Sequence, residues 1–408
     1  MLLSRRSLTL LAAAGVLPVA RAQAQAGRLA GREIRIGAIV PSSGPFAEWG
    51  RANAATLRMV EEQVNGAGGV EGAKLKLFIY DDAARPAQAA NLVRKLADDD
   101  KVLAIAGPLT SSACEVAFPV ANQAKLPAIS QASSKPGTAA ANRPWAFRNT
   151  IDEAVLMRSA LPFLKTTYKV AKAAVIYDAK DANSVSLGTR IMPEMLAEHG
   201  IALANAGNLA SFNTGDIDVS AQVTALKGLN PDAVVCAADY SQAVTVIREM
   251  RRQGFVKPVI GGTPLISSAI LRAAPDMPII STATYYAGQE GEAAKRFTDA
   301  VTPVLRRTAG LPNTIEPSMY DAHMYEIVGI YLDAVRKAGI TLADADLEAD
   351  RGRIRGHLEH LTSYNGLSGP IHFNPDGDAV KTYFVVVGQN GRWTEKLRGC
   401  STAGNLTC

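Results

Sequence analysis

Short apolar runs alternate with stretches of helical periodicity along most of this 408-residue chain. Each apolar run is brief and unbroken, as expected for a strand of a parallel sheet that is covered on both faces. These runs lie at residues 34–40, 75–80, 102–106, 128–130, 173–177, 233–237 and 258–261. The helical stretches lie at residues 52–64, 86–98, 112–123, 153–166, 186–199, 218–227 and 241–253. The alternation predicts an α/β fold of βαβ units in doubly wound parallel sheets.

The alternation pauses at residues 147–152 and then restarts, which predicts a boundary between two lobes. Residues 279–286 are interpreted as a connection back towards the first lobe, and a further helical stretch follows at 317–339. Residues 366–387 are interpreted as strands around a turn rich in Asn, Pro, Asp and Gly. Two lobes joined by several crossings form a hinged cleft that closes around a ligand.

In the first half, an apolar strand runs three times into a loop of Ser, Gly, Thr and Ala and then into a helix, at residues 34–50, 102–113 and 126–138. In an open parallel sheet these loops meet at the carboxyl ends of the strands, where helix N-termini present free N–H groups. Short hydroxyl side chains and bare backbone can hold a carboxylate there without a metal or cofactor. We therefore expect a small anionic or zwitterionic ligand, with no cofactor and no metal.

Residues 1–26 combine Arg5 and Arg6 with an apolar run from Leu8 to Val19 and a series of small-residue steps. This order is typical of an export signal peptide that is later cleaved, and the paired arginines resemble a twin-arginine signal. The segment carries three arginines and no acid, so its removal lowers the formal charge from +5 to +2. We expect an exported protein that binds no nucleic acid, because no basic stripe with interleaved aromatic residues is present.

The four cysteines fall into two groups. Cys114 and Cys236 lie within or beside apolar segments, which predicts free buried thiols. Cys400 and Cys408 lie close together in a polar tail, where an oxidising compartment allows them to form a disulfide.

Several motifs occur in the same order as in a known family, at residues 36–45, 65–70, 80–82, 212–218, 320–322 and 369–371. The ordered set resembles the leucine/isoleucine/valine-binding protein family, the type I periplasmic solute-binding components of ABC importers. The resemblance covers nearly all of the chain after the signal.

This resemblance implies two Rossmann-like lobes with three crossovers and a ligand cleft between them. It places residues 27–149 and 284–368 in lobe I, and residues 150–283 and 369–408 in lobe II. It further implies a periplasmic monomer that is not an enzyme and that delivers its ligand to an ABC permease in the inner membrane. No nucleophile elbow, phosphate-binding loop or dinucleotide fingerprint follows a strand, which favours binding over catalysis.

On the first lobe, the resemblance places the ligand carboxylate near Ser111 and Ser112 at the start of a helix. Ala132, Ser133 and Ser134 match the segment that contacts the amino group through a carbonyl and a hydroxyl. The alternative role for Ser111 and Ser112 is helix capping.

Trp49 stands where the family often has an aromatic residue over the ligand side chain. Ordinary packing at the lobe surface is its alternative role.

The second lobe departs from the amino-acid pattern of the family. Thr263 stands where amino-acid binders have an acid for the ammonium group, and Asp181 lies in a loop where the family has an aromatic residue. Asp239 and Tyr240 occupy a further position that contacts the ligand in the family. Asp239 is also suited to cap the helix that follows it.

Two classes of ligand therefore remain open. An amino acid would use Asp239 for its ammonium group, whereas an aromatic or aliphatic acid without an amine would need no acid opposite the serines. We favour the amino acid. A ligand sensor with the same two lobes is an alternative to an importer component.

Overall fold

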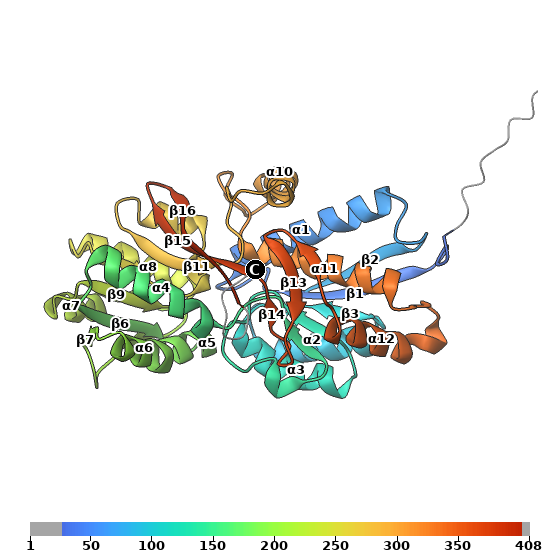
Figure 1. Ribbon diagram of the computed structural model, residues 1–408, viewed down its shortest axis with the longest axis horizontal. Helices are drawn as coiled ribbons and strands as arrows, with labels where there is room; N and C mark the ends of the chain where they lie inside the picture. The colour runs from blue at the N-terminus through green and yellow to red at the C-terminus, as the bar shows by residue number, and fades with distance from the viewer. Residues whose placement is uncertain (1–26, 402–408) are drawn as a thin grey trace, which may run out of the picture.

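The computed structural model describes residues 27–401, which form two lobes side by side, each built around a sheet (Figure 1). The predicted signal peptide and the predicted partner of Cys400, Cys408, lie outside the described residues. Cys114 and Cys236 are free and buried, as expected. Among the described residues, no helix is both long and apolar enough to cross a membrane.

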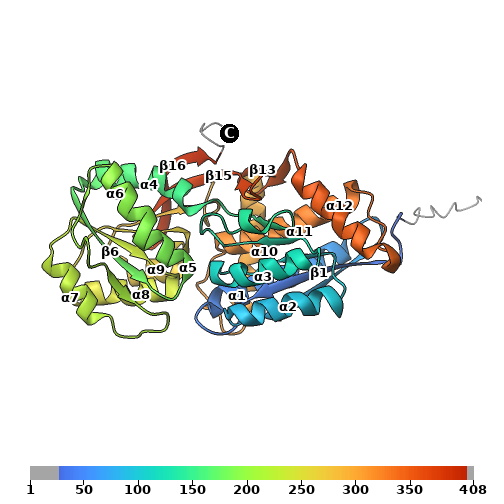
Figure 2. The same cartoon turned by 90° about the horizontal axis from the view of Figure 1, so that it is seen from below.

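The first sheet has five parallel strands in the order β2-β1-β3-β4-β5. Its strands are β1 (Glu33–Val40), β2 (Lys74–Asp81), β3 (Ala104–Ala106), β4 (Ala128–Ser130) and β5 (Ala146–Arg148). Its early helices are α1 (Ala47–Gly66), α2 (Pro86–Asp98) and α3 (Ser111–Gln123). Three later helices lie in the same lobe, namely α10 (Glu292–Arg307), α11 (Met319–Lys337) and α12 (Leu347–Glu359) (Figure 2).

The second sheet follows the order β16-β15-β11-β10-β9-β6-β7, with β8 also paired to β6. Its strands are β6 (Lys172–Asp178), β7 (Ala202–Leu203), β8 (Ala210–Phe212), β9 (Ala233–Ala237), β10 (Val259–Ile260), β11 (Ile279–Ala283), β15 (Thr382–Gln389) and β16 (Arg392–Cys400). Its helices are α4 (Glu153–Tyr168), α5 (Ala182–Ser186), α6 (Met192–Glu198), α7 (Ser220–Gly228), α8 (Tyr240–Arg252) and α9 (Ser268–Ala273). A small third sheet joins β12 (Tyr364–Gly366), β13 (Gly369–Phe373) and β14 (Ala379–Val380).

Both large sheets have the same winding, which determines where a ligand can bind. In each, the first strand of the lobe is an inner strand, with β1 between β2 and β3 and β6 between β7 and β9, so the strand order reverses between β1 and β3 and again between β6 and β9. Ligands of open α/β sheets bind beyond the carboxyl ends of the strands at such a reversal. The loops that follow β1, β3 and β4 on one lobe and β6, β9 and β10 on the other are therefore the candidate binding loops.

The predicted α/β class is correct, and two local predictions are wrong. Residues 279–283 form strand β11 of the second sheet, not a simple connection, and the chain leaves this lobe only after it. The single helix expected at 186–199 is α5, a π turn at Leu187–Ile191 and then α6. Pro193 has no N–H to donate to the preceding turn, and a widened turn accommodates that loss.

The chain passes between the lobes after β5, after β11 and between β14 and β15, and a buried ion pair lies at these crossings. Lys381, which directly precedes β15, places its Nζ 2.6 Å from Oε2 of Glu326 on α11. The Asn149 side chain, beside the first crossing, donates to the same oxygen at 2.8 Å. Both charged side chains are only 2–3% exposed. The pair therefore connects two of the crossings to lobe I.

We expect Glu326→Gln to lower the free energy of unfolding by about 3–5 kcal/mol, because it leaves the Lys381 charge buried without a counter-charge. Asp299→Asn is the control, since it breaks the Lys295–Asp299 pair, in which both side chains are more than 60% exposed. That change should cost less than about 1 kcal/mol. Denaturant unfolding of both variants measures the difference, and equal losses would contradict the importance of the buried pair.

Candidate functional site

The first-lobe side of the site is a cluster of serine hydroxyls at the N-terminus of α3. Thr110 is the N-cap of this helix and accepts a hydrogen bond from Ala113 N at 3.1 Å. Capping is therefore done by Thr110, while the N–H groups of Ser111 and Ser112 lie in the first turn, where a helix has no internal acceptors for them. Ser111 Oγ accepts from Ser133 Oγ at 3.0 Å. The arrangement suits a carboxylate placed against the helix end.

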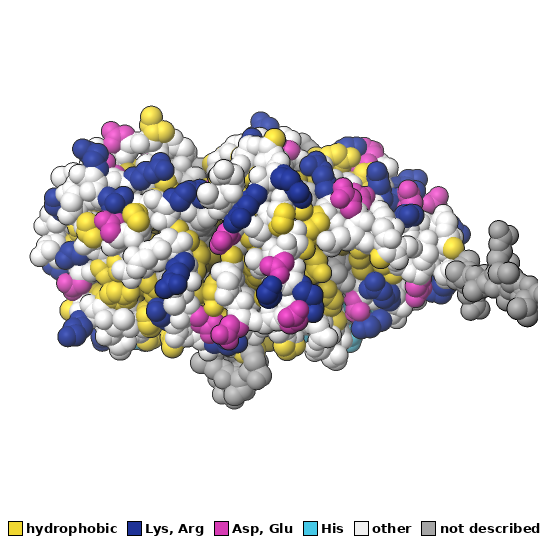
Figure 3. Space-filling model, turned by 90° about the horizontal axis from the view of Figure 1, so that it is seen from above, with side chains coloured by type: hydrophobic (Ala, Val, Ile, Leu, Met, Phe, Trp, Pro, Cys, Tyr) yellow, Lys and Arg dark blue, Asp and Glu magenta, His cyan; other side chains and the backbone are white. Residues whose placement is uncertain are grey.

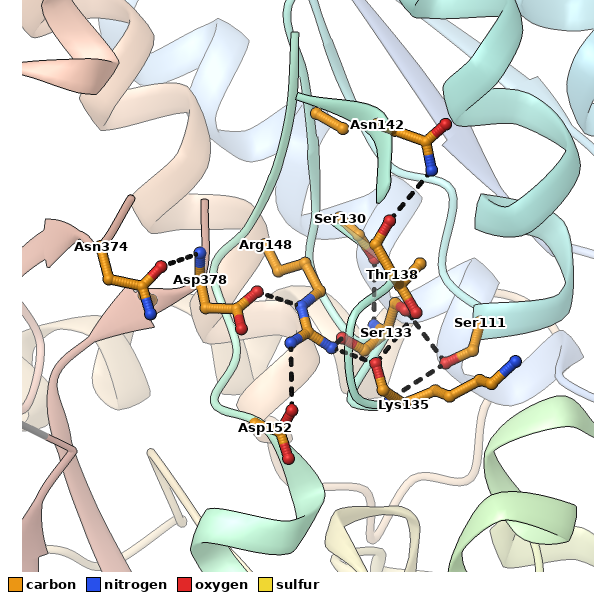
Figure 4. A network of polar contacts seen from close by, with 12 residues as sticks. Ser111, Ser130, Ser133, Lys135, Thr138, Asn142, Arg148, Asp152, Asn374 and Asp378 are labelled. Carbon is orange, nitrogen blue, oxygen red and sulfur yellow. Dashed lines mark hydrogen bonds and ion pairs between the residues drawn. The ribbon is translucent and has the colours of Figure 1, made fainter. Parts of the chain in front are cut away.

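Arg148, at the end of β5, holds the loop that carries Ser133 and Ser134 (Figure 4). Its guanidinium donates to the carbonyls of Ser133 at 3.1 Å and Lys135 at 2.6 Å. It also lies 2.6 Å from the carboxylate of Asp378 and 3.7 Å from that of Asp152. The Arg148 side chain is completely buried. One cation therefore ties the serine loop to the first crossing and to the turn between β13 and β14.

Glu153 is the most prominent side chain of the site that sequence reasoning missed. It is the first residue of α4, it is completely buried, and its N–H donates to the carbonyl of Ser134 at 2.9 Å. Ser134 Oγ donates to Glu153 Oε2 at 2.6 Å, and the N–H of Thr263 donates to Oε1 at 3.1 Å. The Asn183 amide donates to Oε2 at 3.4 Å. The carboxylate thus lies between the serine loop of the first lobe and two loops of the second.

The position of Glu153 explains why Thr263 stands where an acid was expected. A Cβ on Gly262 would lie 2.7 Å from the Glu153 carboxylate, so this glycine leaves the room that the carboxylate occupies. Thr263, the next residue, supplies two donors to the same group through its N–H and its hydroxyl. The acid therefore comes from the start of α4 instead of the loop after β10. Burial raises the pKa of Glu153, and the hydroxyl of Ser134 acts against that rise.

Asp239 and Asp181 bring two more carboxylates to the second-lobe side. Asp239 caps α8, and its Oδ1 accepts from the N–H and the hydroxyl of Ser241 at 2.7 Å each. Asp181 caps α5 through Ser184 and is partly exposed. Burial raises the pKa of Asp239 to about 7, and the Asp181 charge acts in the same direction. No Lys or Arg of the described chain forms an ion pair with Glu153, Asp181 or Asp239.

Three aromatic rings from both lobes close one side of the site. Trp49 on α1 lies with its ring centroid 4.4 Å from that of Tyr240 on α8 and 4.6 Å from that of Tyr320 on α11. All three are buried. Burial raises the pKa of Tyr320, whose hydroxyl is within hydrogen-bonding reach of Thr263, and the charges of the three acids add to the rise.

A pocket of about 580 Å³ opens between the lobes beside the site. Ser112 and Lys135 line it from the first lobe, and Asp181 and Arg190 line it from the second. Ser112 Oγ accepts from Ala182 N at 3.1 Å across the boundary. On the face drawn in Figure 3, basic and acidic side chains are interspersed over both lobes, without a patch of one sign.

The structure thus brings together all of the predicted ligand residues of both lobes, with Ala132 in the serine loop, where its N–H donates to Ser130 Oγ at 3.3 Å. Glu153 gave no signal of its own in the sequence. An Asp-Glu pair at a helix start is ordinary, because acidic residues are favoured in the first turn. Only the three-dimensional proximity of Ser134 and Gly262 distinguishes it.

Comparison with known proteins places these features in a family. A family model described as periplasmic binding protein matches residues 33–392. An amino acid binding protein of Pseudomonas aeruginosa is 28% identical over 229 residues, covering 54% of this chain and 58% of that protein. The leucine-, isoleucine-, valine-, threonine-, and alanine-binding protein of the same organism is 25% identical over 359 residues, covering 88% of this chain and 90% of that one.

Two solved structures show the same fold. LivJ of Streptococcus pneumoniae in complex with isoleucine has a TM-score of 0.77 at 23% identity, covering 90% of this chain and 99% of that one. A solute-binding protein of an ABC transporter from Rhodopseudomonas palustris BisB5, in complex with 3,4-dihydroxybenzoic acid, has a TM-score of 0.75 at 19% identity, covering 91% and 98%.

We expect Asp239→Asn to stabilise the ligand-free protein more at pH 8 than at pH 5. The folded pKa of about 7 lies above the ordinary value of 3.8, so the folded state holds a proton that the unfolded state has released between these values. Stability linked to this group is therefore lost as the pH rises through that window. Asparagine caps a helix as well as aspartate, so the variant removes the charge and keeps the cap.

The expected gain at pH 8 is about 1 kcal/mol or more, seen as a melting temperature a few degrees above that of the parent. Asp218→Asn is the control, because Asp218 accepts from Ser220 N near the start of α7 and is exposed. If Asp239→Asn and the parent melt at the same temperature at every pH, the charge on Asp239 does not destabilise the folded protein.

Proposed function

We propose that this chain, which belongs to the periplasmic binding protein family, captures one small solute with both a carboxylate and an ammonium group, an amino acid, between its lobes. It then delivers the solute to an ABC permease. Its relatives include proteins named for amino-acid binding, and its structural neighbours hold isoleucine in one case and an aromatic acid in another. These ligands share the carboxylate and differ in the amine. The identity of the ligand therefore depends on the groups that face the carboxylate site.

The carboxylate binds at the start of α3. Ser111 and Ser133 offer hydroxyls there, and the first-turn N–H groups offer donors and the positive end of the helix dipole. Charge-assisted hydrogen bonds of this kind are about twice as strong as neutral ones. No basic side chain is needed for the site.

The single observation that carries the proposal is the buried carboxylate of Glu153 beside these serines, without an ion-pair partner in the described chain. A buried charge that lacks a counter-charge is costly. The ammonium group of an amino acid supplies that counter-charge next to Ser134. A plain acid would instead bring a second negative charge close to Glu153, which favours the amino acid over the aromatic or aliphatic acid.

Contacts between the lobes support capture by closure. The rings of Trp49 and Tyr240 pack together, and Arg272 lies 3.9 Å from Glu48 across the boundary. Closure removes water from the site, and the attraction between the ligand and Glu153 strengthens as the local dielectric falls. We also propose a periplasmic location, reached through the export signal of residues 1–26 with its twin arginines, and a monomeric protein without catalysis.

The proposed lobes follow from the sheets. Residues 27–149 and 284–380 make lobe I, and residues 150–283 and 381–401 make lobe II. The boundary expected at residue 369 is wrong, because β13 and β14 pair with β12 and the chain crosses only between β14 and β15. This division places Glu153 a few residues beyond the first crossing.

We expect Glu153→Gln to weaken amino-acid binding at least about tenfold, because an unpaired ammonium is left in a closed site. Gln has the same shape, so the space left by Gly262 still fits it. Titration calorimetry with leucine and with benzoate measures the effect, and benzoate should bind Glu153→Gln no more weakly than the parent. Glu292→Gln, on the exposed start of α10, is the matched control and should leave both affinities unchanged.

Tight binding of benzoate by the parent, with no binding of any amino acid, would contradict the amine in this proposal. Binding of a sugar in place of every carboxylate would contradict the anion site itself.

A further inference from the structure

Asp181 and Asp239 remain without a role in holding the α-groups of an amino acid. Asp181 Oδ2 accepts hydrogen bonds from the N–H and the hydroxyl of Ser184 at 2.8 Å each. Asp239 Oδ1 accepts the equivalent pair from Ser241 at 2.7 Å each. The other oxygen of Asp239, Oδ2, is buried and has no hydrogen-bond partner in the described chain. An unpaired buried carboxylate oxygen is costly and needs a donor.

Helix capping does not explain the charge on these residues. Asparagine and serine cap helices about as well as aspartate. Two carboxylates that face one site repel each other, and burial adds a desolvation cost. The burial of Asp239, which is 3% exposed, makes that cost large. A site that keeps both acids is built for a positive charge.

No basic side chain of the described residues forms an ion pair with either acid. Lys135 pairs with Glu115, and Lys180 and Arg190 line the pocket beside Asp181 without an ion pair to it. Arg51 donates to the carbonyls of Ser42 and Gly310, and Arg272 lies against Glu48 at the rim. Asn183 adds a second buried oxygen, Oδ1, that has no hydrogen-bond partner in the described chain. The donors of Thr263 and Asn183 on the second lobe are used by Glu153, so the buried oxygens of Asp239 and Asn183 are left for donors of the ligand.

The aromatic rings suit the stem of such a ligand. Trp49 packs against Tyr320 and against Tyr240, which directly follows Asp239. Long cationic side chains bury their methylene groups against apolar surfaces and keep the charged end on polar partners. Aromatic faces also attract cations.

We infer that the ligand is an amino acid whose side chain ends in an ammonium or guanidinium group, and that Asp181 and Asp239 hold this distal cation. The inference rests on the proposed function, because the α-carboxylate and α-ammonium are assigned to the serine loop and to Glu153. It makes the second lobe the part of the protein that selects the side chain.

Matched ligands test this inference. Lysine and norleucine differ only by the distal ammonium group, and arginine and citrulline differ by the charge of the terminal group. Titration calorimetry of the full mature protein should give lysine or arginine an affinity about tenfold or more above that of its neutral counterpart. Asp239→Asn should reduce that ratio at least about tenfold while changing norleucine binding less than about twofold.

Asp218→Asn, outside the site, should leave every affinity unchanged. Asp181→Asn is a second variant with the same expected loss of selectivity, and it decides the outcome if Asp239→Asn does not melt cooperatively. Norleucine binding as tight as lysine binding, with a ratio that neither variant alters, would overturn the inference and leave the proposed function standing. If no amino acid binds while benzoate does, the proposed function fails and the inference fails with it.

Discussion

The buried carboxylate of Glu153 constrains the rest of the site. A negative charge removed from water must find donors, and here they come from Ser134 on one lobe and from Thr263 and Asn183 on the other. Its own N–H is bound to the carbonyl of Ser134, which fixes the start of α4 against the serine loop. Gly262 has no side chain because this carboxylate occupies the space. Several otherwise unconnected features thus follow from the burial of one charge.

Arg148 holds the serine loop in this position through buried hydrogen bonds. It lies at the end of β5 and binds the backbone of the serine loop, Asp378 near β14, and Asp152 beside the site (Figure 4). Its guanidinium is pre-organised and planar, so it can bind several oxygens at once without large entropic cost. The serine loop and two of the three crossings therefore share one rigid support.

Much of the fold could be predicted from the sequence, because buried parallel strands are short continuous apolar runs. Strands β4 and β9 and helix α2 have the predicted bounds. Strand β11 was interpreted as a connection, and the antiparallel pairing with β15 that places it in the sheet is not visible locally. The serine loops were predictable for a similar reason, since they follow strands in a repeated pattern.

The ammonium side of the site could not be predicted in the same way. Asp239 was recognised, and the structure shows that it caps α8, whereas its contact with a ligand stays a prediction. Glu153 was missed because an acid in the first turn of a helix is common and does not indicate what lies across the cleft.

The short length of chain between β5 and α4 bears on the order of events in capture. Only four residues separate Arg148 from Glu153, so the chain keeps Glu153 close to the serine loop. In the proposed capture, an open protein therefore already displays the groups assigned to the α-carboxylate and the α-ammonium. In the same proposal the acids after β6 and β9 reach the ligand only when the lobes approach, so discrimination between side chains is expressed in how slowly a ligand leaves and not in how fast it arrives.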